Sequence, residues 1–137
     1  MDTGREYTER WHHQMQIRDA TDRPLLLEDR WLGSLLDISV RALPAAYASC
    51  EAPDGASVRL VVDNKAAHTW TLQKLEGRWT LDRGTHGEAH TTVTLSADTA
   101  WRLFYNALAP DDLQRRVLVT GDAALAEPLL RARSIVI

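Results

Sequence analysis

Hydrophobic and polar residues follow their most regular pattern within residues 91–133, which predicts a strand, a helix, a second strand and a second helix. The alternation over residues 92–95 is typical of a half-buried strand. Ser96 is a good helix N-cap, because its hydroxyl accepts hydrogen bonds from N–H groups of the first turn. Apolar residues then recur at spacings of three and four over residues 100–108, which predicts one buried helical face. Pro110 is expected to end this helix in a short turn.

The rest of this stretch predicts the second strand and the second helix. Residues 117–119 form a short β-rich run, and the turn that follows ends at Asp122, which can cap the next helix. Pro128 lies beyond the first turn of that helix, so we expect either a kink there or two short helical pieces. Residues 134–137 are expected to close the fold as a last strand.

Two helices and three strands are predicted upstream of this stretch. Helical spacing favours a first helix over residues 2–20 and a second over residues 28–47, kinked or ended by Pro44. Three strands with a period of two follow, at residues 58–63, 69–74 and 78–82. The dipeptide Glu76-Gly77 connects the last two as a tight hairpin, because glycine readily takes a positive φ.

This order of elements predicts an α+β fold, in which a mainly antiparallel sheet of about five strands carries helices packed on one face. The hairpin fixes the register of its two strands. Leu72 should lie nearly opposite Leu81, and Trp70 and Trp79 should share one face of the sheet.

Length and composition are those of one ordinary globular domain: 137 residues, 45% hydrophobic and 26% charged. A net charge of −3 with scattered basic residues gives no support for nucleic-acid binding. Cys50 is the only cysteine, which favours a reducing compartment. The polar start, MDTGREYTERWHH, does not read as a signal peptide, and no apolar run reaches the length of a membrane span. We therefore expect a cytoplasmic protein.

Two strings near the C-terminus identify a related family. VTLSADTAWRLFYNAL at residues 93–108 and RRVLVTGDAALAEPLLRARSIVI at residues 115–137 resemble the C-terminal domain of the mycothiol-dependent maleylpyruvate isomerase family, which is related in fold to sterol carrier protein type 2. YTERWHHQMQIRDA, at residues 7–20, resembles the last helix of the DinB-like four-helix bundle that precedes this domain. The resemblance implies a remnant bundle helix at residues 1–22 and a sterol-carrier-like domain at residues 23–137.

The resemblance also implies a metal site, because the DinB-like bundle holds a divalent metal with an early His and a Glu-x-x-x-His pair on its last helix. Glu9 and His13 match that pair, and their spacing places both on one helix face. Two ligands are too few for a zinc site, so a third would have to come from another chain. His86 and His90 have the same spacing but lie in a Gly-containing loop, where nothing fixes a common face.

Aromatic residues suggest a ligand pocket between the sheet and its helices. The resemblance to sterol carriers favours a cavity there, whereas close packing of protein interiors favours a filled core. The candidate lining residues are Trp70, Trp79, Trp101, Phe104 and Tyr105.

Three functions follow from these observations, and the first is preferred. It is a non-catalytic module that binds a small apolar or thiol-containing molecule, or that serves as an accessory domain. The second is part of a metal- and mycothiol-dependent isomerase or transferase whose metal site another chain completes. The third is a structural homodimer, since the ridge of Tyr7, Trp11 and Met15 needs burial. The sequence contains no complete catalytic motif such as Gly-x-Ser-x-Gly.

Overall fold

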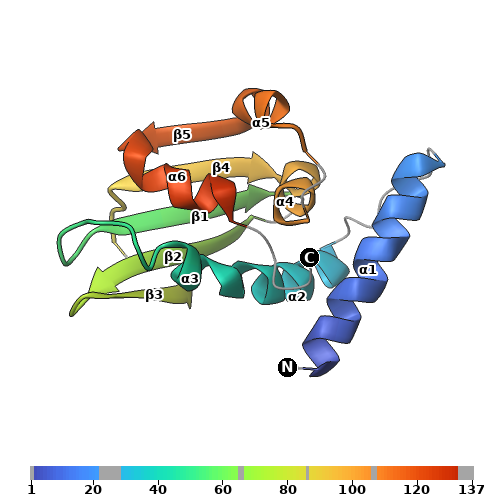
Figure 1. Cartoon of the computed structure of the whole chain (residues 1–137), viewed down its shortest axis with the longest axis horizontal. Helices are drawn as coiled ribbons and strands as arrows, with labels where there is room; N and C mark the ends of the chain where they lie inside the picture. The colour runs from blue at the N-terminus through green and yellow to red at the C-terminus, as the bar shows by residue number, and fades with distance from the viewer. Residues whose placement is uncertain (1, 22–28, 65–66, 86, 106–107, 133–137) are drawn as a thin grey trace.

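The computed structural model describes residues 2–21, 29–64, 67–85, 87–105 and 108–132 (Figure 1). Its helical elements are α1 (Asp2–Ala20), α2 (Asp29–Ser39), the 3-10 helix η1 (Val40–Ala42), α3 (Leu43–Ala46), α4 (Ala97–Phe104), α5 (Pro110–Arg116) and α6 (Ala123–Arg131). Its strands are β1 (Ser57–Asp63), β2 (His68–Leu75), β3 (Arg78–Arg83), β4 (Thr91–Ser96) and β5 (Val117–Gly121).

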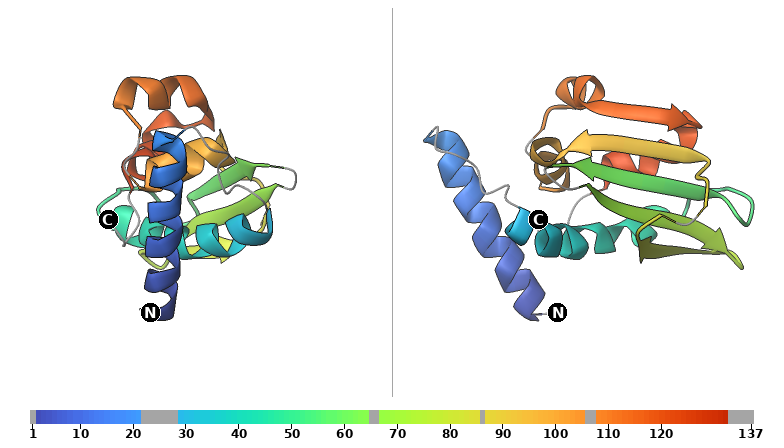
Figure 2. Two further views of the ribbon diagram at one scale, coloured as in Figure 1. Left: turned by 90° about the vertical axis from the view of Figure 1, so that its right-hand side faces the viewer. Right: turned by 180° about the vertical axis from the view of Figure 1, so that it is seen from behind.

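The five strands form one sheet in the order β3-β2-β1-β4-β5. β1 and β4, at the centre, are parallel, whereas the other three strand pairs are antiparallel. The helices α2, α3, α4 and α6 lie on one face, and the view from behind shows no helix over the other face of the described sheet (Figures 1 and 2). The predicted fold, a mainly antiparallel sheet of five strands with helices on one face, is confirmed.

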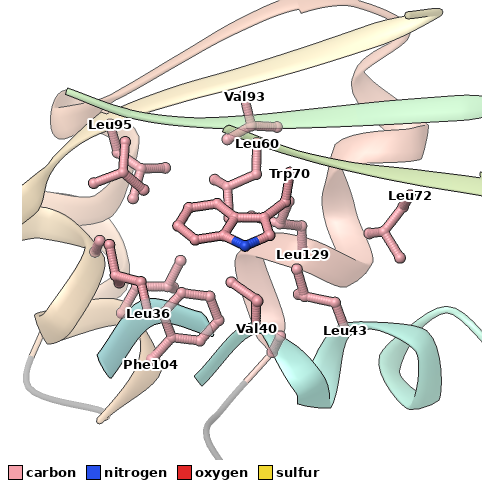
Figure 3. Packing of buried hydrophobic residues seen from close by; sticks show 14 of the residues in the cluster. Leu36, Val40, Leu43, Leu60, Trp70, Leu72, Val93, Leu95, Phe104 and Leu129 are labelled. Atoms are coloured by element: carbon pink, nitrogen blue, oxygen red, sulfur yellow. The ribbon is translucent and has the colours of Figure 1, made fainter. Parts of the chain in front are cut away.

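The inner face of the sheet buries every second side chain of the central strands. Val58, Leu60 and Val62 of β1 are fully buried, and so are Val93 and Leu95 of β4. Figure 3 shows the centre of this core, where side chains from the sheet meet side chains from the helices. Full burial of one such aliphatic side chain stabilises the fold by about 1.5–3 kcal/mol, so this layer supplies most of the driving force.

The hairpin between β2 and β3 has the predicted geometry. Glu76 has φ of 52° and Gly77 has φ of 75°, as a tight turn with two left-handed residues requires. Leu72 pairs with Leu81, as predicted. Trp70 and Trp79 both face the helices and are buried.

The structure differs from the sequence-based expectations at Pro110, at Pro44 and in part at Pro128. Pro110 begins helix α5 where a turn was expected, because proline suits the first helical position and the Asp-Asp and Arg-Arg pairs match the two ends of the helix dipole. Pro44 lies in the first turn of α3, which begins at Leu43, so the second helix is interrupted earlier, at η1. α6 continues through Pro128 as one helix, so the alternative of two short pieces was wrong, while a kink at Pro128 stays a prediction. The predicted last strand lies outside the described residues.

Helix α1 packs on its own chain. Trp11 and Met15 are buried, and the Trp11 ring lies 6.0 Å from that of Trp101 and 5.9 Å from that of Tyr105. Arg102 donates from both terminal nitrogens to the Asp19 carboxylate. Burial of Trp11 and Met15 therefore does not require a second copy. The side chain of Tyr7 lies outside the described residues, and the homodimer stays a prediction. Of the helices in the described ranges, none is both long and apolar enough to cross a membrane.

Gly121 offers a test of how closely β5 approaches the start of β4. Its φ is +94°, and a Cβ atom there would lie 2.1 Å from the carbonyl oxygen of His90. We expect Gly121→Ala to lower the free energy of unfolding by about 3 kcal/mol or more, because backbone must move. Gly77→Ala is the control: its φ is +75° with nothing within 4 Å, so it should cost only about 1 kcal/mol. If urea denaturation shows that both variants lose the same free energy of unfolding, the close approach of Gly121 to His90 does not constrain the fold.

The ion pair between α1 and α4 predicts an acid-sensitive contact. The hydrogen bond from Arg102 holds the pKa of the Asp19 carboxyl below its ordinary value. A lowered folded-state pKa means that the contact stabilises docking at neutral pH and is lost as the pH falls through that pKa. Asp19→Asn should therefore speed hydrogen exchange in α1 at pH 7 but not in acid. Asp112→Asn removes an ion pair within α5 and should leave α1 unchanged; equal effects of both variants would disprove the prediction.

Candidate ligand-binding site

A cavity of about 340 Å³ lies where α4, α5, β5 and α6 meet at one end of the sheet. It is partly open to solvent. Its lining is mostly aliphatic, and the residues are Leu103, Leu108, Leu113, Gln114, Val117, Val119, Glu127, Leu130 and Arg131. No aromatic side chain is among them.

The local structure explains why these side chains converge. Val117 and Val119 point to the same face of β5, while Leu118 between them is exposed on the other face. Leu130 and Glu127 are three residues apart on α6, which places them on one side of that helix. Leu103, at the inner end, is almost fully buried and joins the cavity wall to the main core.

The space exists because α5 has little with which to fill it. Its sequence, PDDLQRR, has Leu113 as its only large aliphatic side chain, and Leu113 remains half-buried. Asp111 and Asp112 begin the helix and Arg115 and Arg116 end it, and these side chains favour water. A helix with one apolar side chain covers the end of the sheet without packing it densely.

Polar side chains lie at the mouth of the cavity. Arg131 forms an ion pair with Glu127 at 3.4 Å, with 75% and 60% of the two side chains exposed. The same pair also borders a second, more polar hollow between α3 and α6, which includes Ser49 and the half-buried Cys50. The site thus combines an apolar interior with charged groups at its edge, as small-molecule sites commonly do.

The five aromatic residues predicted as ligand contacts are all buried in the main core, outside the cavity lining. Three of them have hydrogen-bond partners: the indole N–H of Trp70 donates to Asp37, that of Trp101 donates to Asp98, and the hydroxyl of Tyr105 bonds with Ser39. The indole nitrogen of Trp79 is buried and has no hydrogen-bond partner among the described residues. Ligand contact by Trp70, Trp79, Trp101, Phe104 and Tyr105 stays a prediction.

The aromatics form two clusters at different places. Trp101 and Tyr105 meet Trp11 beneath α1, whereas the ring of Trp79 lies 4.8 Å from that of Tyr47 on α3. Burial raises the pKa of Tyr47, whose hydroxyl donates to the carbonyl of Leu125. Tyr47 thereby ties α3 to α6, and its hydrogen bond requires the protonated phenol.

The predicted metal ligands lie on α1, away from the cavity lining. His13 is exposed, and the side chain of Glu9 falls outside the described residues. Within the part of the chain that the structure describes, no group of three or more His, Cys, Asp or Glu side chains converges. His86 also lies outside that part, while His90 accepts a hydrogen bond at Nδ1 from the backbone N–H of Ser57. Metal binding by Glu9 and His13 stays a prediction.

Comparison with known proteins identifies the fold. No model of a known protein family matches the chain, and neither does any curated protein. The palmitated sterol carrier protein 2 like 2 from Aedes aegypti superposes with a TM-score of 0.54 at 17% identity, covering 72% of this chain and 96% of that one. A crystal structure of the same Aedes aegypti protein superposes with a TM-score of 0.52 at 18% identity, covering 69% of this chain and 93% of that one. Sterol carrier protein 2 from Yarrowia lipolytica gives 0.50 at 18% identity, with coverage of 76% and 92%.

The chain therefore has the sterol carrier protein 2-like fold. Identities of 17–18% establish the fold alone. The resemblance to the maleylpyruvate isomerase family and to a DinB-like helix rests on the sequence strings, and it stays a prediction.

Because the cavity lies beside β5, we expect β5 to tolerate a larger inward-facing side chain better than its neighbour β4 does. Val119 lines the cavity, while its pairing partner Val93 is fully buried in the packed core. Val119→Phe has space to occupy and should change the free energy of unfolding by less than about 1 kcal/mol, whereas Val93→Phe overpacks the core and should cost about 1–3 kcal/mol. Urea denaturation measures both, and similar losses would show that the space beside Val119 is filled in solution.

Proposed function

We propose that this domain binds a small, mainly apolar molecule in the cavity between α4, α5, β5 and α6, without catalysis of its own. The observation that carries the proposal is the cavity itself. Its volume of about 340 Å³ falls within the range of small-molecule sites, and aliphatic side chains from four elements line it.

The cavity chemistry supports a ligand with an extended hydrocarbon part. Each methylene transferred from water into such a site contributes about 0.8 kcal/mol. Several methylenes are needed, because association first costs several kcal/mol of lost translational and rotational freedom. The polar end of the ligand would lie at the mouth, near Gln114, Glu127 and Arg131, where it keeps contact with water.

The structural likeness supports the same proposal. One of the proteins with this fold was solved in a palmitated form, so the fold accommodates a fatty acyl chain in at least that protein. For the present chain, a role as a carrier or an accessory domain for apolar molecules follows by analogy of fold, which is a weaker argument than the cavity.

The metal- and mycothiol-dependent isomerase or transferase is a second candidate, favoured by the Glu9-x-x-x-His13 spacing on α1. In this proposal residues 1–22 are the remnant of the DinB-like bundle and residues 23–137 are the sterol-carrier-like domain. A further chain supplies the third residue that coordinates the metal. Metal analysis of the purified wild type and of His13→Ala distinguishes the candidates: metal lost with His13 supports the second, and a metal-free wild type removes it.

Displacement of a fluorescent fatty-acid analogue by palmitate tests the preferred function. We expect Val119→Phe to weaken palmitate binding at least tenfold, because the new ring occupies the space beside Leu113 and Leu130. Leu118→Phe is the matched control: it makes the same kind of change on the exposed side of β5, where 62% of Leu118 is accessible, and should leave the affinity unchanged.

Two results would oppose the cavity proposal. If palmitate fails to displace the analogue from the wild type, the domain does not bind fatty acyl chains. If both phenylalanine variants bind palmitate as the wild type does, the ligand lies elsewhere, and the buried aromatic clusters become the next candidates.

A further inference from the structure

The two outer strands of the sheet differ in how they are protected. β3, at one edge, carries Arg78, Asp82 and Arg83 among six residues. β5, at the other edge, has the sequence VLVTG and no charge. Charged side chains on an edge strand discourage pairing with another chain, so only β3 has this protection.

Within the part of the chain that the structure describes, no strand pairs with the outer edge of β5. The described sheet ends at β5, and Figure 1 shows that strand along its upper margin, with α5 at the end where the strand begins. Leu118, in the middle of β5, is 62% exposed. This is more than any other large hydrophobic residue in the described part of the chain. An uncharged strand with an exposed leucine suits addition of another strand through backbone hydrogen bonds.

The residues that flank β5 select the partner. Arg116 precedes the strand and Asp122 follows it, at equal distances of three residues from Val119. When two copies of β5 pair antiparallel about Val119, Arg116 of each copy lies opposite Asp122 of the other. Directly opposite charges stabilise an antiparallel pair. The chain is thus complementary to itself at this edge.

We propose that β5 is a homodimerisation edge, at which two copies pair antiparallel about Val119 and join their sheets into one of ten strands. The arrangement is a closed twofold interface, the commonest symmetry among soluble oligomers. Leu118 of each copy then lies opposite Thr120 of the other. This proposal is independent of the proposed ligand.

The charges also fix the register. Moving the centre of pairing from Val119 to Leu118 places Arg116 opposite Thr120, and moving it to Thr120 places Arg116 opposite Ala124. Both shifts remove both ion pairs. The present contacts leave room for the new ones: Arg116 is 43% exposed beside Asp98, and Asp122 uses Oδ1 to cap α6 through the Ala124 N–H.

Sedimentation equilibrium over a range of concentrations tests the dimer. We expect the wild-type mass to rise from 15.4 kDa towards twice that value as the concentration increases. Arg116→Glu places like charges at both ends of the interface and should abolish the rise. Arg115→Glu is the matched control, because it makes the same charge change at an exposed neighbour that faces no charge in the dimer.

A mixing experiment tests the register itself. Asp122→Lys alone also places like charges together and should stay monomeric. An equal mixture of Arg116→Glu and Asp122→Lys chains should regain the dimer, because a mixed pair has opposite charges at both ends. Circular dichroism confirms that each variant is folded.

Three outcomes would overturn the proposal. The first is a wild type that remains at 15.4 kDa at the highest attainable concentration. The second is loss of association in Arg115→Glu as complete as in Arg116→Glu. The third is a mixture of the two complementary variants that does not regain the mass of the dimer.

Discussion

Burial of one face of the sheet determines the arrangement of the rest of the molecule. Trp70 lies at the centre of that face, among Leu60 of the sheet and Val40 and Leu43 of the helical layer (Figure 3). Its indole N–H donates to Asp37 of α2 at 2.9 Å, and Asp37 also accepts from Arg83 of β3. A large apolar ring with a satisfied polar atom therefore fixes both the position of α2 and the face that the helices cover.

Dense packing at the centre contrasts with incomplete packing at the β5 end. The central strands bury every inward side chain, whereas Val117, Val119 and Leu113 remain half-buried around a cavity. The difference arises from α5, whose charged sequence cannot fill the space that it covers. The candidate site is thus a consequence of the composition of one short helix, and the uncharged edge of β5 lies beside it.

The sequence predicted the sheet well because its signals are local. Alternation defines the strands, Ser96 caps α4 through the Thr99 N–H, and Asp122 caps α6 as expected. The sequence did not predict α5, because proline followed by two aspartates is equally typical of a turn and of a helix start. It suggested a pocket between the sheet and the helices but did not predict the residues that line this cavity. Val119 and Leu130 have the pattern of ordinary core residues, and only the three-dimensional fit shows that they are not fully covered. The aromatic residues drew attention for their size, yet large side chains fill space more often than they line it.

We propose that an apolar ligand binds in the cavity at the β5 end and not in the aromatic core. Methyl chemical-shift changes on addition of palmitate distinguish these two places. Binding in the cavity should shift the methyl signals of Leu113, Val117, Val119 and Leu130, with little change at Leu36 and Leu43, which lie in the packed core around Trp70. Shifts confined to Leu36 and Leu43, or no shifts at all, would contradict it.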